Sequence, residues 1–167
     1  VTLGLNYRVI GGPRFYERQE IRDAMAFFRV VSQPADDLAF ERIVNVPKRG
    51  LGEAAVRQIH DVARARGIPM LAAARELILT DELKPRPRKS LTDVAEMFTR
   101  WQGMLETKPG HELAETILEE SGYTEMWQND RSADAPTRLE NLKELIETIS
   151  GFESMRAFLE HVASVSY

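Results

Sequence analysis

The chain has 167 residues, of which 43% are hydrophobic and 29% are charged, and its formal net charge is −4. This balance is typical of a folded domain with a hydrophobic core and excludes a disordered chain. Cysteine is absent, which excludes disulfides, thiol nucleophiles and zinc–thiolate sites. No apolar run approaches the ~20 residues of a membrane helix. We therefore expect a cytoplasmic protein with no membrane partner.

Charge is unevenly distributed along the chain. Residues 1–89 contain 16 Lys and Arg against 11 Asp and Glu, whereas residues 90–167 contain 6 against 15. A basic half followed by an acidic half favours one face that meets an anionic partner. The alternative interpretation is an ordinary solvated face.

The first residues show the alternation of a β-strand. Hydrophobic residues alternate with small or polar ones from Leu3 to Val9, and Gly11-Gly12-Pro13 ends the pattern. No second strand pattern follows, and a single strand cannot pair its own backbone groups. We therefore expect this strand to be orphaned from a neighbouring domain of a longer chain.

From Glu17 onward the hydrophobic period is that of helices. The pattern predicts helices over residues 17–33, over a short stretch capped by Asp36 or Asp37, over 53–66, over 69–79, from Ser90 past Leu105, around 113–120, over 136–149 and over 152–162. Ser90 and Asp93 resemble a capping box. Residues 84–89 are basic and contain two prolines, which indicates a loop. The sequence therefore predicts an irregular all-α domain of seven or eight helices.

The bend Lys48-Arg49-Gly50-Leu51-Gly52 is the strongest candidate for a binding site. Glycines let a phosphate approach the backbone closely, and a helix start at residue 53 adds a partial positive charge. We expect Leu51 to point inward, and Lys48 and Arg49 to pair with phosphates without reading a base sequence. The alternative is a plain turn between two helices.

Two other basic features extend this hypothesis. Arg57 and Arg64 lie seven residues apart on one side of the helix that follows the bend, where they could contact the same anion or merely face solvent. The basic loop 84–89 is either a second contact with DNA or an ordinary flexible loop.

Motifs of catalysis are missing from the sequence. The chain contains no G-x-x-x-x-G-K-[ST] phosphate loop, and its three histidines are far apart without ligand spacing. Ser, His and Asp occur in no local arrangement that indicates a triad. We therefore predict no catalytic residue, no metal site and no cofactor in this chain.

Four blocks of sequence resemble one family. The blocks are residues 7–23 (Tyr7-Arg8-Val9-Ile10-Gly11-Gly12-Pro13 and the following Arg14 to Asp23), residues 34–52, Ser121-Gly122-Tyr123, and Arg138-Leu139-Glu140-Asn141-Leu142. In order and spacing they are similar to superfamily 1 DNA helicases of the UvrD/PcrA/Rep group. Residues 78–89 depart from that pattern, so the resemblance says nothing about the basic loop.

The resemblance implies a parent helicase that moves 3′→5′ on single-stranded DNA and hydrolyses ATP with magnesium in domains absent from this chain. It implies that residues 1–13 end domain 2A and that residues 14–167 form the helical subdomain 2B. This subdomain contacts the duplex ahead of the fork through the Gly50-Leu51-Gly52 turn and rotates between open and closed states. The implied partners are the backbone of double-stranded DNA, the motor domains of the same helicase and repair proteins.

Two other functions remain open on the sequence alone. The acidic half, residues 90–167, could belong to a protein-interaction module that docks repair or transcription proteins. The bend between two helices could also belong to a free-standing helix–hairpin–helix DNA-binding protein.

Overall fold

A computed structural model describes residues 13–165, which form ten helices and no strand. The helices are α2 (Pro13–Glu17), α3 (Gln19–Ser32), α4 (Asp37–Ile43), α5 (Glu53–Arg66), α6 (Met70–Leu77), α7 (Pro85–Met104), α8 (Gly110–Glu120), α9 (Tyr123–Gln128), α10 (Ala135–Ile149) and α11 (Met155–Ser164). The predicted all-α class is confirmed. The strand predicted over residues 3–10 lies outside the described residues.

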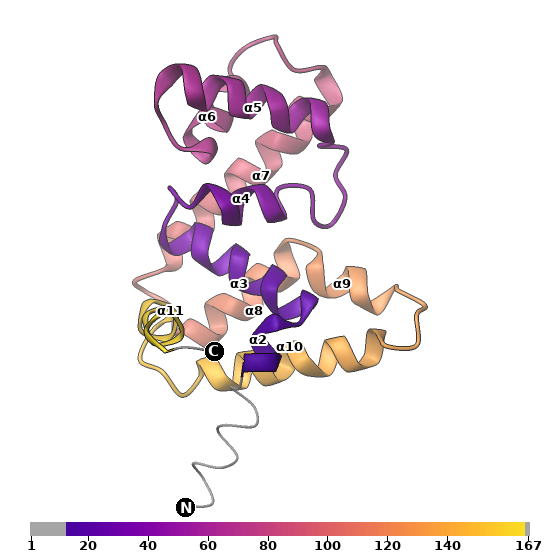
Figure 1. Ribbon diagram of the computed structural model, residues 1–167, viewed down its shortest axis with the longest axis vertical. Helices are drawn as coiled ribbons and strands as arrows, with labels where there is room; N and C mark the ends of the chain where they lie inside the picture. The colour runs from indigo at the N-terminus through magenta and orange to yellow at the C-terminus, as the bar shows by residue number, and fades with distance from the viewer. Residues whose placement is uncertain (1–12, 166–167) are drawn as a thin grey trace, which may run out of the picture.

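The helices form an elongated body with two ends (Figure 1). One end consists of α5, α6 and the beginning of α7, and the other consists of α8, α9, α10 and α11 together with α2. Helices α3 and α4 pack on each other between these ends, and α7 contacts α6, α3 and α8 in turn. Because α7 has 20 residues, it is about 30 Å long and runs along much of the body.

One hydrophobic core connects the two ends. At its centre Phe27 of α3 lies 6.4 Å from Phe98 and 6.3 Å from Trp101, both of α7, and 6.1 Å from Tyr123 of α9, measured between ring centroids. Aromatic rings in such edge and stacked arrangements bury large apolar areas and fix the relative position of their helices. The core therefore fixes α3, α7 and α9 relative to one another.

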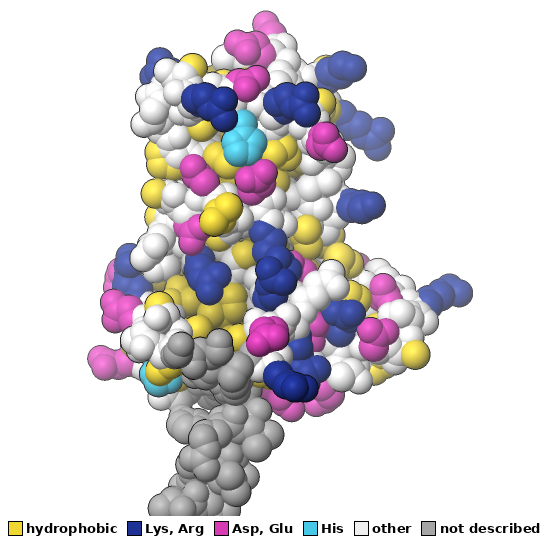
Figure 2. Space-filling model, in the orientation of Figure 1, with side chains coloured by type: hydrophobic (Ala, Val, Ile, Leu, Met, Phe, Trp, Pro, Cys, Tyr) yellow, Lys and Arg dark blue, Asp and Glu magenta, His cyan; other side chains and the backbone are white. Residues whose placement is uncertain are grey.

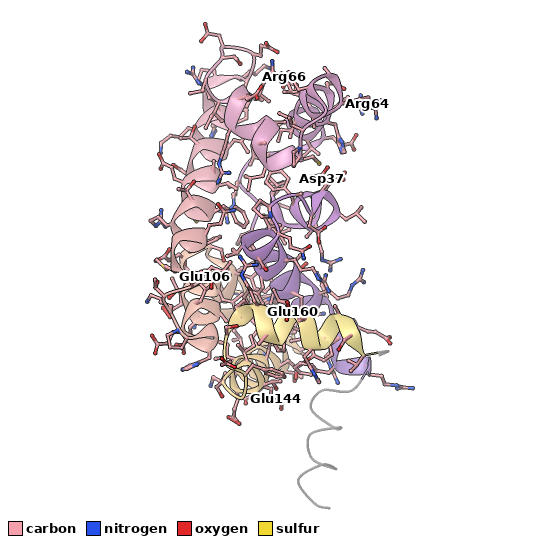
Figure 3. The ribbon with its side chains drawn as sticks, turned by 90° about the vertical axis from the view of Figure 1, so that its left-hand side faces the viewer. Asp37, Arg64, Arg66, Glu106, Glu144 and Glu160 are labelled. Carbon is pink, nitrogen blue, oxygen red and sulfur yellow. The ribbon has the colours of Figure 1, made fainter. Side chains whose placement is uncertain are left out.

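Two neighbouring aspartates cap two different helices. Asp36 Oδ1 accepts a hydrogen bond from Ala39 N at 3.1 Å and so caps α4. The sequence predicts either Asp36 or Asp37 as this cap. Asp37 Oδ1 accepts from Met70 N at 2.9 Å and caps the start of α6, which lies above it (Figure 3). This tertiary contact connects helices that are separated by α5 in the chain.

The prediction of a loop over residues 84–89 was wrong, because α7 already begins at Pro85. Pro85 and Pro87 occupy the first turn of the helix. Backbone N–H groups there have no intrahelical acceptor, so a proline without an N–H group does not break the helix. Ser90 is therefore inside the helix and is not the predicted N-cap. Its hydroxyl donates instead to Arg49 O at 2.8 Å.

Two short helices, α2 and α9, were not predicted. Helix α9 has six residues and α2 has five, which is too short for a period of 3.6 to emerge from the sequence. Gly122, at the start of α9, adopts the left-handed conformation with φ 83°, and this turns the chain sharply between α8 and α9.

Candidate nucleic-acid interface

The bend between α4 and α5 owes its shape to Asn45. The Asn45 Oδ1 atom accepts hydrogen bonds from Arg49 N at 2.6 Å and from Leu51 N at 3.1 Å. Gly50 adopts φ 80°, a left-handed conformation that favours glycine. Leu51 is 1% exposed and is packed in the core, as predicted. The bend is therefore a built turn with a defined backbone path.

The two glycines of the bend lie at the surface. Gly50 and Gly52 are exposed, and within residues 13–165 their backbone amides have no hydrogen-bond partner. Gly52 is the N-cap of α5 and no side chain caps this helix, so the first amides of α5 also lack an intrahelical acceptor. This arrangement offers several donors and the positive end of a helix dipole to an anion.

Arg49 holds the bend to the rest of the molecule. Its Nη2 atom donates to Ser121 O at 2.7 Å, and its own carbonyl accepts from Ser90 Oγ. Partial burial lowers the pKa of the Arg49 guanidinium, an effect that nearby Asp93 opposes. The predicted phosphate ligand Arg49 thus has a structural contact as well, and it joins the bend to the α8–α9 junction.

The remaining predicted cations are accessible. Lys48 is exposed and forms no ion pair with any described residue. Arg57 and Arg64 are exposed on α5, and Arg64 projects outward from that helix (Figure 3). Arg57 lies 3.7 Å from Glu53, with both side chains mostly exposed, and such surface pairs contribute little. Several basic side chains lie at the end of the molecule that α5 occupies (Figure 2).

The basic residues at the start of α7 are partly engaged in ion pairs. Arg88 Nε donates to Ile78 O at 3.1 Å and Lys89 Nζ lies 2.9 Å from Asp93 Oδ1. Lys84 and Arg86 are exposed. A rigid helix start, and not a flexible loop, presents these charges.

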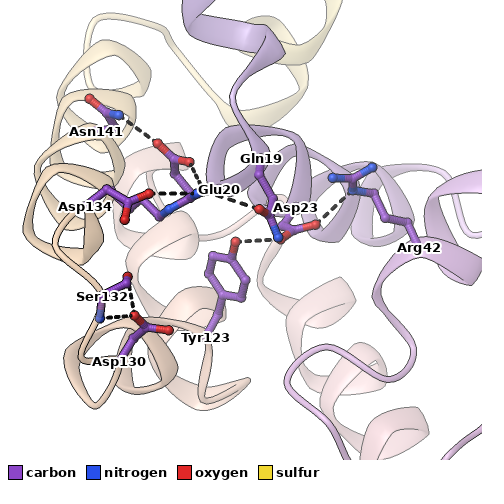
Figure 4. A network of polar contacts seen from close by, with 10 residues as sticks. Gln19, Glu20, Asp23, Arg42, Tyr123, Asp130, Ser132, Asp134 and Asn141 are labelled. Atoms are coloured by element: carbon purple, nitrogen blue, oxygen red, sulfur yellow. Dashed lines mark hydrogen bonds and ion pairs between the residues drawn. The ribbon is translucent and has the colours of Figure 1, made fainter.

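A buried polar network lies beside the bend, and sequence reasoning missed it (Figure 4). Asp23 accepts from Tyr123 Oη at 2.6 Å and from Arg42 Nε at 2.8 Å. Glu20, one turn earlier on α3, accepts from Arg138 Nη1 at 3.0 Å and from Asn141 Nδ2 at 2.7 Å. These contacts hold α3 against α4, α9 and α10.

The signal that could have revealed the network was the resemblance itself. Glu20, Asp23, Tyr123, Arg138 and Asn141 all belong to the blocks that carry it. A buried carboxylate needs hydrogen-bonding partners, so charged residues within an apolar helical face call for partners elsewhere in the chain. Which residues these are becomes visible only in three dimensions.

No part of residues 13–165 brings together three or more His, Asp or Glu side chains in a way that could hold a metal ion. None of the described helices is long and apolar enough to cross a membrane.

The fold and the bend together define a helical module with an exposed glycine turn at the start of a helix. The family model of the UvrD-like helicase C-terminal domain matches residues 1–162, and the chain belongs to this family.

Similar proteins include a probable DNA helicase II homolog of Rickettsia felis, 36% identical over 165 residues that cover 99% of this chain and 25% of that protein. The ATP-dependent DNA helicase PcrA of Bacillus subtilis is 34% identical, with 98% of this chain and 23% of the relative covered. DNA helicase II of Escherichia coli is 32% identical, with 94% and 23% covered. The chain spans about a quarter of the length of these relatives.

Proposed function

We propose that this chain is the duplex-binding and regulatory subdomain of an ATP-dependent 3′→5′ DNA helicase and that it performs no catalysis alone. In this proposal residues 14–167 form subdomain 2B, residues 1–13 end the neighbouring domain 2A, and other domains of the parent bind ATP and magnesium. The names of the relatives, which include DNA helicase II and ATP-dependent DNA helicase PcrA, support the proposal.

The observation that carries the proposal is the exposed turn at Gly50 and Gly52, with unpaired amides at the start of α5. Such a turn binds the phosphate backbone of a duplex regardless of base sequence. Lys48, Arg49, Arg57 and Arg64 supply positive charge around the turn and along α5. Leu51 anchors the turn from inside. Binding is therefore expected to be weak, insensitive to sequence and steeply dependent on salt.

The sharpest test is Gly52→Ala. A Cβ atom added at Gly52 meets nothing within 4 Å, and its backbone, with φ −80° and ψ −165°, suits any residue. The fold is therefore expected to tolerate alanine, with a change in the free energy of unfolding of about 0.5 kcal/mol or less. A methyl group there would still obstruct the close approach of a phosphate. We expect a fluorescence titration with a hairpin duplex to show weaker binding.

The matched control for this test is Gly103→Ala in α7, where an added Cβ also meets nothing within 4 Å. This variant is expected to bind the hairpin like the unmodified chain. Equal duplex affinity for Gly52→Ala and Gly103→Ala would rule the turn out as the binding site.

A second experiment removes one positive charge and measures how the duplex affinity depends on salt. Lys48→Ala removes an exposed cation with no partner among the described residues, so it is expected to reduce the slope of log affinity against log salt by about one. Lys143→Ala on α10, which removes an exposed cation 3.7 Å from Glu140, serves as the charge-matched control. A slope that is the same in both variants would contradict the role of Lys48.

A further inference from the structure

A groove with an apolar floor is formed mainly by the two middle helices, α3 and α4. It lies among α2, α3, α4 and α11 and has a volume of about 560 Å³. Met25 and Ala26 of α3, Ala39 of α4 and Val162 of α11 contribute apolar lining. Leu38 of α4 also lines it and is 84% exposed. A leucine that projects into solvent beside an apolar hollow offers a hydrophobic contact to a ligand.

The charges around this groove are mainly positive. Arg22 and Arg29 of α3 line it, are exposed, and form no ion pair with a described residue. Arg42 also lines it, but its Nε atom is bound to Asp23. The carboxylate in the lining, Asp36, accepts a hydrogen bond from Ala39 N as the cap of α4. Within residues 13–165, Arg22 and Arg29 therefore have no acidic partner, and Figure 2 shows basic side chains on both sides of an apolar area in this region.

The spacing of the two free arginines restricts the shape of the ligand. Arg22 and Arg29 are seven residues apart on one helix, so they lie about 10 Å apart on the same face, with Met25 and Ala26 between them. An extended chain presents side chains on one face at about 7 or 13 Å. A helical ligand presents residues i and i+7 about 10 Å apart, with i+3 and i+4 between them on the same face.

We propose that this groove binds an acidic helical segment of a partner protein, in which two carboxylates two turns apart flank an aliphatic residue. The carboxylates pair with Arg22 and Arg29, and the aliphatic residue packs against Leu38 and Met25. Nucleic acid fits this groove less well, because the floor is aliphatic and the Asp36 carboxylate lies in the lining. The inference concerns a different surface from the proposed duplex site and does not depend on it.

The test uses a fluorescein-labelled peptide of about 15 residues with two glutamates seven positions apart and leucine between them. Its anisotropy is titrated with the 167-residue chain at low salt. The double variant Arg22→Glu/Arg29→Glu reverses both free cations and is expected to weaken binding about fivefold or more. Leu38→Ser is expected to weaken it by a similar factor, since it removes an apolar contact. Hairpin-duplex affinity is expected to stay the same for Leu38→Ser.

The chain offers matched controls for both substitutions. Leu79 is 82% exposed and does not line the groove, and Arg131 is exposed with no ion pair among the described residues. Leu79→Ser and Arg131→Glu are therefore expected to bind the peptide like the unmodified chain. Circular dichroism and thermal melting establish that each variant is folded.

Three results would overturn the inference. A peptide of the same composition with adjacent glutamates could bind equally well, which would show non-specific attraction. Single-stranded DNA of equal charge could compete for the groove as well as the peptide, which would indicate a nucleic-acid site. Sedimentation could show self-association that Leu38→Ser abolishes, which would make a second copy of the chain the occupant.

Discussion

Asn45 controls the geometry of the proposed duplex site although it needs no contact with DNA. Its side-chain oxygen accepts hydrogen bonds from two backbone amides of the bend, those of Arg49 and Leu51. These amides are thereby removed from the donors that an anion could use. The amides of Gly50 and Gly52 have no hydrogen-bond partner among the described residues and stay available. A single residue thus decides which backbone groups of the bend face a ligand.

We predict that Asn45→Ala lowers the free energy of unfolding by about 1–3 kcal/mol, because two amides lose their acceptor. Asn45→Asp keeps an acceptor at the same place, so its stability is expected to be close to that of the unmodified chain. The added negative charge beside the bend is nevertheless expected to weaken duplex binding. Urea denaturation and the hairpin titration measure the two effects separately. An aspartate variant as unstable as the alanine variant would contradict the role given to Oδ1.

Gly110 is a second residue whose size matters. A Cβ atom there would lie 2.7 Å from Met155 N and 3.0 Å from Ser154 C, at the place where the start of α8 meets the start of α11. Because both atoms belong to the backbone, they cannot move aside as a flexible side chain would. Gly110→Ala is therefore expected to cost about 1–3 kcal/mol in urea denaturation.

Gly103→Ala is the comparison for this substitution, since the added methyl group meets nothing. Gly103 lies in the last turn of α7, so alanine is expected to raise the free energy of unfolding by about 0.4–1 kcal/mol, because it restricts the unfolded chain. A lower free energy of unfolding for Gly110→Ala together with a higher one for Gly103→Ala would support the close approach of α8 and α11. A neutral Gly110→Ala would contradict it.

At the scale of helices, the network around Glu20 and Asp23 decides how α3 sits among its neighbours. Glu20 is 2% exposed and Asp23 is 5% exposed, so each carboxylate depends on its partners for hydrogen bonds. Arg138 donates to Glu20 and also lies with its Cζ atom 4.6 Å from the centroid of the Trp127 ring. The network therefore fixes the packing of α3, α9 and α10 as one unit.

Tyr123→Phe tests the network directly. It leaves the ring in the core but removes the donor to Asp23, and it is expected to cost about 1.5–3 kcal/mol because the acceptor is charged. Urea denaturation at neutral pH measures this loss. A loss below about 0.5 kcal/mol would show that Arg42 alone satisfies Asp23.

The pH dependence of the same variant gives an independent readout. Burial, and then the hydrogen bond to Asp23, raise the pKa of the Tyr123 hydroxyl above its ordinary value of 10.0. Because the pKa is raised in the folded state, the protonated Tyr123 hydroxyl contributes fully to the free energy of unfolding below pH 10. This contribution falls as the pH rises above 10. Above pH ~10 the unmodified chain is expected to lose about 1.4 kcal/mol per pH unit more than Tyr123→Phe. Parallel curves for the two proteins would contradict this.

Over the whole molecule, the bend and the network are connected by a short series of contacts. Arg49 binds Ser121 O, the Ser121 hydroxyl accepts from Tyr123 N, and Tyr123 binds Asp23 of α3. Helix α7 also holds the bend, because Ser90 Oγ donates a hydrogen bond to Arg49 O. The proposed duplex site and the groove beside α3 and α4 are therefore parts of one packed body.

Much of the fold followed from the sequence, but only where a pattern was long enough. Helix α5 was predicted over 53–66 and has these bounds, since its apolar stripe is regular and Gly67 ends it in a left-handed conformation. The start of α7 was missed because two prolines resemble a break, although the first turn of a helix accepts them. Helix α9 was missed because it is short.

The candidate site was likewise predicted only in part from the sequence. The inward position of Leu51 followed from the local pattern of a hydrophobic residue between glycines. The partners of Asn45 and Arg49 did not follow, because they depend on how the chain turns back on itself. Arg49 meets Ser121, 72 residues away, and no local period contains that information.

The anchoring of the bend also has a thermodynamic consequence for association. Its backbone is held by Asn45, Arg49 and Ser90 before any ligand arrives, so it loses its conformational entropy when the chain folds. Binding to this preorganised turn then requires little additional ordering. In Asn45→Ala the turn would have to become ordered on the DNA. Calorimetry with a hairpin duplex is therefore expected to show a smaller entropic penalty of binding for the unmodified chain than for Asn45→Ala.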